Sequence, residues 1–399
     1  MKITHIHIER FRGFQNEDFE VGSLLTAIAG QNGTQKSTLL GIITQTFTLK
    51  TEDSMRVEKP LCGGSYISAF KDKFRLSPTF DKPKGHEWTI SFDAGMDDFT
   101  VESIKRTGDP NVRFWKKGAR QEGDGYISFP TIFLSLKRLV PVAEEAKIIT
   151  DDTLLTQEEL NEFKQLHNKI LIAQTPISSA TTITSKNKQS IGVSTELYDW
   201  NQNSMGQDNL GKIILALFSF KRLHDKYPRQ YKGGILAIDE MDATMYPASQ
   251  VELLKVLRKY ASKLNLQILF TTHSMSLLKA MDDLVQEVTK KEETANQAKI
   301  LYLKKVDDKI AIKQGVNFKG IQLDLNVVAE GNNRKKNRIT GIYGRQGKYL
   351  ICKSYFKEQG FCVGFCGCNI TMFNINGTCN QKSACFYISI FYCYIRWGC

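Results

Sequence analysis

The stretch that decides the fold is Ala29–Leu40, AGQNGTQKSTLL, which follows the apolar run Leu24–Ile28. A strand, a glycine-containing loop and a helix in this order are the context of a phosphate-binding P-loop, whose pattern is G-x-x-x-x-G-K-[ST]. Backbone N–H groups of such a loop bind phosphate oxygens at the helix N-terminus. One position departs from the pattern, because Gln35 stands where glycine should precede Lys36. The alternative is a glycine-containing turn before an ordinary core helix, so the interpretation depends on the rest of the chain.

The loop provides nine candidate nucleotide-binding residues: Gly30, Gln31, Asn32, Gly33, Thr34, Gln35, Lys36, Ser37 and Thr38. We expect Lys36 to neutralise the β- and γ-phosphates of ATP and the Ser37 hydroxyl to bind Mg²⁺. Gln35 is expected to weaken nucleotide binding or hydrolysis, since a side chain close to bound phosphate crowds the loop or requires strained backbone angles.

Two further strands end in polar residues that suit phosphate chemistry. Gly234–Glu240, GILAIDE, ends in Asp239, expected to orient Mg²⁺ through its water shell, and Glu240, expected to polarise the attacking water. Leu266–Phe270 is another apolar strand, and His273 follows it. Each motif alone is also typical of a solvated strand end. Because open α/β sheets bind ligands at the carboxyl ends of their strands, the sequence predicts that these residues meet the P-loop.

A fourth motif lies upstream, in Asn203–Leu210, NSMGQDNL, before the apolar helix Ile213–Phe220. Ser204, Gly206 and Gln207 resemble the LSGGQ signature of ABC-type ATPases, with Met205 in place of a glycine. Four motifs in this order resemble an ABC-type head, an α/β P-loop NTPase with an antiparallel β-subdomain. In that class His273 matches the switch histidine that senses the γ-phosphate, and Met241–Pro247, MDATMYP, resembles the D-loop of SMC- and RecF-like heads.

The N-terminal segment Met1–Glu20 alternates apolar and polar residues and runs into Phe11–Phe14, FRGF. It resembles the opening strand pair of SMC/RecF-like heads. His5 and His7 share one strand face at a spacing that a metal could use. No cysteine or third histidine is near them in sequence, so solvated strand histidines are the simpler interpretation.

We expect an ATPase head over residues 1–325, with a β-subdomain at about 51–130 and a helical insertion at about 143–200. Short antiparallel strands are predicted at Trp88–Phe92, at Phe99–Ile104 and, after Asp109-Pro110, at Val112–Trp115. Leu134–Val142, LSLKRLVPV, is expected to close a strand, with Lys137 and Arg138 reaching phosphate or a partner.

Within the insertion, a capping box from Thr156 to Glu159 predicts an amphipathic helix over Thr156–Ile172. Thr175–Ser194 is rich in Ser, Thr and Lys, and predicts a mobile loop. Only some sixty residues separate Val142 from the signature, too few for a long coiled coil, in which each heptad pair takes about fourteen residues.

The tail, residues 326–399, differs in composition from the head and is expected to be irregular. Residues 331–399 hold ten Lys or Arg and one acid, Glu358, so +9 of the chain's net charge of +12 lies there and +3 remains for residues 1–330. The head therefore shows no strong nucleic-acid footprint. With no signal peptide or 18-residue apolar span, we expect a cytoplasmic protein without membrane contact.

Eight of the nine cysteines lie in the same tail: Cys352, Cys362, Cys366, Cys368, Cys379, Cys385, Cys393 and Cys399. The spacings between Cys362, Cys366 and Cys368 do not match paired C-x₂-C zinc knuckles. With one carboxylate after residue 330, the tail cannot assemble a metal-dependent nuclease site.

Three segments together, GQNGTQKSTLLG, FLSLKRLVPV and AIDEMDATMYP, resemble the ATPases of bacterial anti-phage systems of the Septu type, the PtuA proteins, including those found with retrons. The resemblance covers roughly residues 1–340. It implies an ATP- and Mg²⁺-dependent ATPase that forms a homodimer or higher oligomer. It also implies a partner HNH endonuclease and, in retron versions, a reverse transcriptase with its RNA–DNA hybrid.

Two other families share the head motifs. A RecF/SMC-like DNA-repair ATPase differs only in its partner, and in the OLD family a Toprim-like nuclease domain follows the head. A one-nucleotide frame shift of the back-translated tail allows CSTLMELAT for Met372–Asn380 and Asp-Gly-Asp-Val for Arg396–Cys399, and Asp-Gly-Asp is the acidic signature of Toprim-like domains. The tail from about Gly341 is then a frameshifted product of a longer gene, or else a genuine cysteine-rich tail. An ATPase that turns over and a nucleotide-sensing scaffold also remain alternatives.

Overall fold

The computed structural model describes residues 1–66, 73–93, 95–105, 112–118, 125–140, 148–151, 154–173, 175–185 and 189–326, and then 342–343, 349–351, 361–366 and 369–374. The chain divides into two compact units, Met1–Ala329 and Glu330–Cys399. In the second unit four short strands form an antiparallel sheet: β17 (Ile342–Tyr343), β18 (Tyr349–Ile351), β19 (Phe361–Cys366) and β20 (Asn369–Asn374). Glu358 and six of the eight tail cysteines lie outside the described residues.

A six-stranded sheet with the order β16-β15-β3-β14-β13-β9 is the centre of the first unit. Its strands are β3 (Leu25–Gly30), β9 (Thr131–Leu134), β13 (Gly234–Ile238), β14 (Leu266–Thr272), β15 (Ala298–Val306) and β16 (Lys309–Gln314). All pairs are parallel except β15 with β16. Every residue of β3, β13 and β14 is buried, as expected of parallel strands covered on both faces. The strands predicted before the P-loop, before the acidic pair and before His273 are confirmed, and in the sheet the histidine strand β14 lies between β3 and β13.

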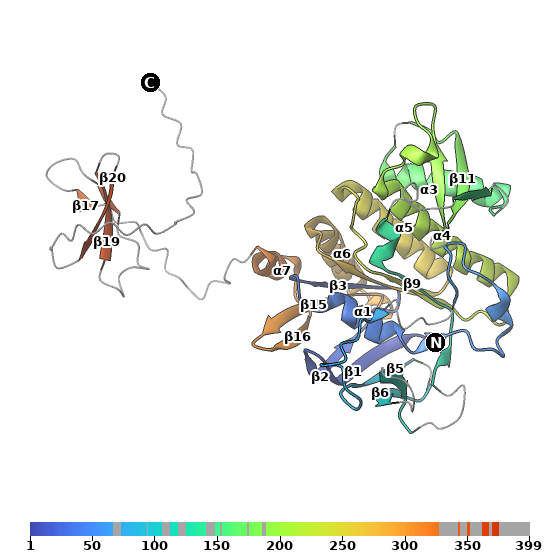
Figure 1. Cartoon of the computed structure of the whole chain (residues 1–399), viewed down its shortest axis with the longest axis horizontal. Coiled ribbons are helices and arrows are strands. Elements are labelled where there is room, and N and C mark those ends of the chain that lie inside the picture. The colour runs from blue at the N-terminus through green and yellow to red at the C-terminus, as the bar shows by residue number, and fades with distance from the viewer. Residues whose placement is uncertain are drawn as a thin grey trace. The chain divides into compact units, whose positions relative to one another are not determined.

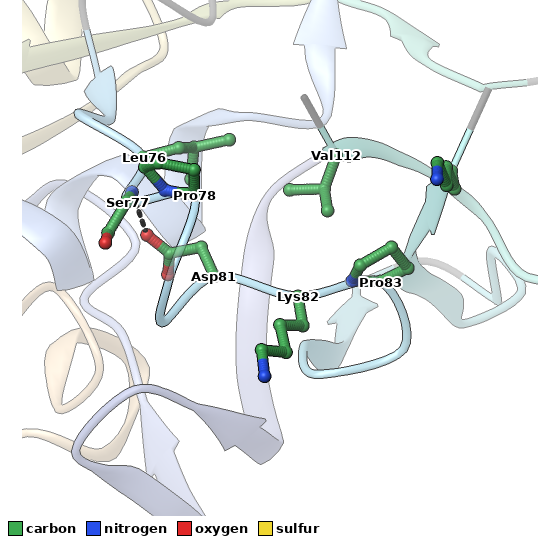
Figure 2. Close-up of a pocket in the computed structure, with 8 residues that line it drawn as sticks. Leu76, Ser77, Pro78, Asp81, Lys82, Pro83 and Val112 are labelled. Atoms are coloured by element: carbon green, nitrogen blue, oxygen red, sulfur yellow. Dashed lines mark hydrogen bonds between the residues drawn. The ribbon is translucent and has the colours of Figure 1, made fainter. Parts of the chain in front are cut away.

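Each face of this sheet has its own hydrophobic core. Along β13, Leu236 and Ile238 contribute to one core, whereas Ile235 and Ala237 contribute to the other. The first core also receives α4 (Met205–Lys226), α5 (Pro247–Lys263), α6 (Met275–Val288) and α7 (Phe318–Leu325), and the second receives α1 (Lys36–Thr44). Figure 1 shows α4, α5 and α6 on one side of β3, β9 and β15, with β1, β2, β5 and β6 on the other.

The β-subdomain is a five-stranded antiparallel sheet with the order β2-β1-β5-β6-β7. Its strands are β1 (Ile3–Phe11), β2 (Phe14–Glu20), β5 (Glu87–Phe92), β6 (Phe99–Lys105) and β7 (Val112–Lys116). This confirms the predicted N-terminal strand pair and the three later strands, while Asp109-Pro110 lies outside the described residues. The rings of His5 and His7 both contact Asp18 on the paired strand, at 3.2 and 3.0 Å.

The sequence predicts a helical insertion, but in the structure the insertion also contains a small β-sheet. The capped helix is present as α3 (Gln157–Leu171), with the capping box between Thr156 and Glu159. A three-stranded sheet accompanies it: β10 (Ile149–Asp151), β11 (Ser179–Thr184) and β12 (Gln189–Ser194). The prediction of a mobile loop over Thr175–Ser194 is therefore wrong where β11 and β12 pair. Ile183, Ile191 and Val193 are buried, so β-branched residues in an otherwise polar segment form a hairpin once a core lies beside it.

The remaining described elements are short. They are β4 (Phe47–Thr48) and β8 (Ile127–Ser128), which pair in parallel, and four 3₁₀ turns, η1 (Ser54–Val57), η2 (Leu136–Leu139), η4 (Trp200–Gln202) and η5 (Glu292–Thr294). Of the segment Leu134–Val142, which the sequence predicts to close a strand, only Leu134 belongs to β9, and η2 begins at Leu136. Residues 141 and 142 lie outside the described residues. Within the described residues, every helix is too short or too polar to span a lipid bilayer.

A buried histidine on α3 should make the stability of the head depend on pH. His167 is 2 % exposed, and neither ring nitrogen has a hydrogen-bond partner among the described residues. Burial lowers the pKa of His167 from 6.5 to about 4. The unfolded chain therefore binds this proton at a higher pH than the folded chain does. The contribution of neutral His167 to the free energy of unfolding is complete above pH 6.5, and it is lost as the pH falls towards 4.

We expect His167→Leu to remove this part of the pH dependence. Between pH 6.5 and 4.5, the free energy of unfolding of the unmodified chain should fall more steeply than that of the variant, by up to about 1.4 kcal/mol per pH unit. Urea unfolding, monitored by circular dichroism at several pH values, measures the free energy of unfolding of both proteins. Equal slopes for the two proteins would contradict the prediction.

Candidate nucleotide-binding site

The P-loop joins β3 to α1 and closes on itself through hydrogen bonds. The Thr34 hydroxyl donates to the Gln31 carbonyl at 2.8 Å, and the Lys36 ammonium donates to the carbonyls of Gly30 and Gln31 at 3.0 and 2.9 Å. Lys36 therefore lies across the loop that precedes it. It occupies the position expected of a phosphate-binding lysine, and its ammonium group is bound by two backbone carbonyls of the loop.

Gln35 adopts the backbone conformation that the missing glycine would favour. Its φ and ψ are 62° and 32°, the left-handed region, and it is the N-cap of α1. The strain of such a residue is on the order of 1 kcal/mol. Its side chain packs at the β1–β2 turn, where a Cβ on Gly13 would lie 2.9 Å from Gln35 Nε2. The loop thus keeps its shape because Gly13 leaves room for the glutamine.

Burial sets the charge state of Lys36. It is 7 % exposed, and burial lowers its pKa to about 8, although the charges of Glu240, Asp239 and Asp242 act in the opposite direction. An anion beside this ammonium stabilises the protonated form, so phosphate binding and protonation of Lys36 favour each other.

One carboxylate oxygen joins the ends of three elements, α1, β13 and β14, at the carboxyl end of the sheet. Oδ1 of Asp239 accepts from the Ser37 hydroxyl at 2.9 Å and from the Thr271 hydroxyl at 2.7 Å. Ser37 lies in the first turn of α1, Asp239 follows β13, and Thr271 lies near the end of β14. The structure therefore brings together the P-loop, the acidic pair and the histidine loop, as the sequence predicted.

The donor set suits a magnesium ion. Mg²⁺ prefers hard oxygen ligands and keeps several waters, using one or two protein groups beside the phosphates. The oxygens of Ser37 and Asp239 lie close enough to serve as one direct ligand and one ligand through water. When bound, the ion would neutralise charge that develops on the phosphates.

The histidine loop faces the same charges. His273 follows β14, and its pKa is lowered, first by burial and then by the positive charge of Lys36, while Asp242, Glu240 and Asp239 oppose the shift. A neutral imidazole can donate one hydrogen bond to a phosphate oxygen. Ser274, the next residue, is the N-cap of α6 and its hydroxyl contacts Gln250.

The signature motif forms the start of a long helix. Ser204 is the N-cap of α4, and it exchanges capping hydrogen bonds with Gln207. Gly206 packs closely against the segment Met241–Met245. A Cβ atom on Gly206 would lie only 2.5 Å from the Thr244 carbonyl oxygen, so this position has no room for a side chain. In the described chain, no hydrogen bond joins Ser204–Gln207 to the P-loop residues of the same molecule.

Arg138 does not reach toward phosphate or a partner, contrary to expectation. It is 2 % exposed and donates to the Asn209 side chain at 2.7 Å and to the Glu240 carbonyl at 2.7 Å. Its neighbour Lys137 is exposed. The 3₁₀ turn η2 explains the difference, since three residues per turn direct adjacent side chains about 120° apart.

Comparison with known protein families identifies the activity of the chain. The family model of an AAA ATPase domain matches residues 135–278, which include α4, β13 and β14 with their loops. The chain is an ATPase. No curated protein sequence matches it significantly.

Solved structures of SMC heads are similar to this ATPase in fold. The SMC head domain from Thermotoga maritima is 14% identical, with a TM-score of 0.44 over 79% of this chain and 100% of that one. A second SMC head, bound to the C-winged helix domain of ScpA, is 14% identical, with a TM-score of 0.45 over 81% and 100% of the two chains. A third, with an extended coiled coil and the C-terminal domain of ScpA derived from Pyrococcus furiosus, is 12% identical, with a TM-score of 0.42 over 82% and 99%.

Sequence reasoning missed several residues that shape the site. Thr271 holds Asp239, Asn209 donates to the Ala243 carbonyl at 2.9 Å, and Gln250 donates to the Met245 carbonyl at 2.8 Å. Thr271 could have been found from its place at the end of an apolar strand. Nothing in the sequence distinguishes Asn209 and Gln250 from other amides on helices.

We expect ATP binding to weaken as the pH rises through about 8. Above that pH the amine of Lys36 becomes neutral in the free ATPase, so the Kd for MgATP should rise about tenfold per pH unit. Lys36→Ala should abolish binding at every pH, because no cation then faces the phosphates.

Titration calorimetry with MgATP at pH 7, 8 and 9 tests both statements. Lys36→Arg is the control for the titration, since a guanidinium keeps its charge over this range and should give a Kd with no such rise. Undiminished binding by Lys36→Ala would remove the P-loop interpretation.

Proposed function

We propose that the chain hydrolyses ATP–Mg²⁺ at the edge of the sheet where the loops after β3, β13 and β14 meet. The assigned roles are Lys36 on the β- and γ-phosphates, Ser37 and Asp239 on Mg²⁺, Glu240 polarising water and His273 sensing the γ-phosphate. The observation that supports this most directly is the shared contact of Ser37 and Thr271 with Asp239. It joins the phosphate loop to the strand end that carries Glu240.

The site is completed by a second copy of the chain. A helix N-terminus attracts anions, and α4 presents its own with the signature residues Ser204–Gln207. Met205 at this end is 43% exposed, an apolar side chain available to a partner surface. In a head-to-head dimer, the signature of one subunit would contact the γ-phosphate of ATP on the P-loop of the other.

Mixing two inactive variants tests the shared site. Lys36→Ala disables the P-loop of its own subunit, and Ser204→Arg disables its own signature, so a mixed dimer retains one intact composite site. We expect each variant alone to be inactive, and an equimolar mixture to recover a substantial part of the wild-type ATPase rate. A mixture that hydrolyses nothing would argue against sites shared between subunits.

The biological role is regulation of a partner nuclease in anti-phage defence of the Septu type. Support comes from the resemblance of the three motif segments. The partner is an HNH endonuclease and, in retron versions, a reverse transcriptase with its RNA–DNA hybrid restrains the complex. A RecF/SMC-like DNA-repair role uses the same motifs, and neighbouring genes for an HNH nuclease and a reverse transcriptase would distinguish the two.

The chain alone should not cleave nucleic acid. Two-metal cleavage needs several carboxylates around a pair of metal ions that lie about 4 Å apart. Among the described residues, no group of three His, Cys, Asp or Glu could hold a metal, and Asp239 and Glu240 are assigned to ATP. After residue 330 the sequence has one acid, Glu358.

Incubation of the purified 399-residue chain with plasmid and single-stranded DNA, with Mg²⁺ or Mn²⁺, should leave both intact. Addition of the HNH partner should produce cleavage that depends on the partner's own active site. Cleavage by the chain alone that disappears in Glu358→Ala would contradict the proposal.

A further inference from the structure

The residue assigned to polarise water has an unusual backbone. Glu240 has a φ of 49°, in the left-handed region that residues other than glycine rarely adopt. Such strain persists only where surrounding contacts hold the residue in place, and it is concentrated at functional sites. The contacts that hold Glu240 therefore determine where its carboxylate points.

Both peptide groups of Glu240 are fixed by side chains from other elements. Its N–H donates to the Thr271 hydroxyl at 2.7 Å, and its carbonyl accepts from the Arg138 guanidinium at 2.7 Å. Thr271 also holds Asp239, so the N-terminal side is anchored to the metal-binding carboxylate. On the C-terminal side, the Glu240 carbonyl also accepts from the Ala243 N–H at 3.1 Å, and the Met241 N–H donates to the Thr271 carbonyl at 3.0 Å. Arg138 is the side chain that contacts this carbonyl, and it comes from η2, an element without an assigned role.

Arg138 is an expensive residue to bury for a structural role alone. Its other donors reach neutral acceptors, the carbonyls of Leu134 and Ser135 and the amide oxygen of Asn209. The pKa of Arg138 is lowered to about 10, with burial the largest cause. A buried charge is often replaced by apolar residues without loss of stability, so its presence here indicates a need for a fixed, forked donor.

Asn209 connects Arg138 to the signature helix. Its side-chain oxygen accepts from Arg138 at 2.7 Å, while its amide donates to the Ala243 carbonyl at 2.9 Å. Asn209 lies in the first turns of α4, close after Ser204–Gln207. Gly206 of the same helix packs against the Thr244 carbonyl. A chain of hydrogen bonds therefore connects the N-terminal part of α4 to Glu240 through Asn209 and Arg138.

We propose that Arg138 is a positioning residue for hydrolysis, which with Asn209 makes the orientation of Glu240 depend on the position of the signature helix. This rests on the proposed role of Glu240. Within the described part of the chain, the hydrogen bonds of Arg138 and Asn209 go to residues outside the P-loop, so we expect both to act on turnover and not on nucleotide affinity. Arg138→Lys keeps the charge but loses the forked geometry, and Asn209→Leu removes both hydrogen bonds at similar volume.

Steady-state ATPase assays and titration calorimetry of purified full-length variants test the proposal. We expect Arg138→Lys and Asn209→Leu each to lower kcat at least tenfold, with KM and the Kd for ATP within twofold of wild type. Arg222→Lys is the matched control. Arg222 lies on α4, the helix that carries Asn209, and its guanidinium binds the Glu159 carboxylate of α3 at 2.6 Å. Its replacement should therefore leave kcat within twofold of wild type. Because Arg138 acts through Glu240, Arg138→Lys should cause no further loss in a Glu240→Gln background.

The outcomes separate this inference from the proposed function. Unchanged hydrolysis in Glu240→Gln would overturn the role of Glu240 and the inference with it. An inactive Glu240→Gln together with Arg138→Lys and Asn209→Leu variants of normal kcat would overturn the inference alone. A parallel loss of kcat and ATP affinity would also overturn it, since that indicates general damage to the site. If thermal unfolding shows that Arg138→Lys is not folded, Asn209→Leu decides.

Discussion

A single oxygen atom, Oδ1 of Asp239, is the point on which the arrangement of the site depends. It accepts hydrogen bonds from hydroxyls at the start of α1 and near the end of β14, and its own residue follows β13. Charge-assisted hydrogen bonds of this kind are stronger than neutral ones. The P-loop helix α1, the end of β13 and the end of β14 are thereby held in fixed positions relative to one another without bound nucleotide.

That junction needs a rigid support, which the two cores provide. The parallel strands β3, β13 and β14 are buried along their whole length, with separate apolar clusters on the two faces. Close-packed interiors transmit displacement with little compliance. The segment Met241–Met245, which follows β13, is held by side chains of both helices, Asn209 of α4 and Gln250 of α5, so the helices on this face are connected to the strand ends.

The sequence was sufficient where burial acts on both faces of an element. Continuous apolar runs identified β3, β13 and β14, and the polar residues after them were correctly expected to meet. It was insufficient where tertiary contacts decide. The hairpin β11–β12 is polar in composition, and only the neighbouring core makes it a pair of strands. The burial of Arg138 beside an exposed Lys137 also follows from the turn η2, which a basic dipeptide does not reveal.

The packing at Gln35 has an evolutionary consequence. A side chain on Gly13 would meet Ile310 Cγ1 at 2.7 Å as well as Gln35 Nε2 at 2.9 Å, so positions 13, 35 and 310 share one small volume. A change at any one of them alters what the other two can be. Glycine at 35 would remove one of the two close contacts of a side chain at 13, and a smaller residue at 310 would be needed to remove the other. The three positions should therefore covary, although they are far apart in sequence.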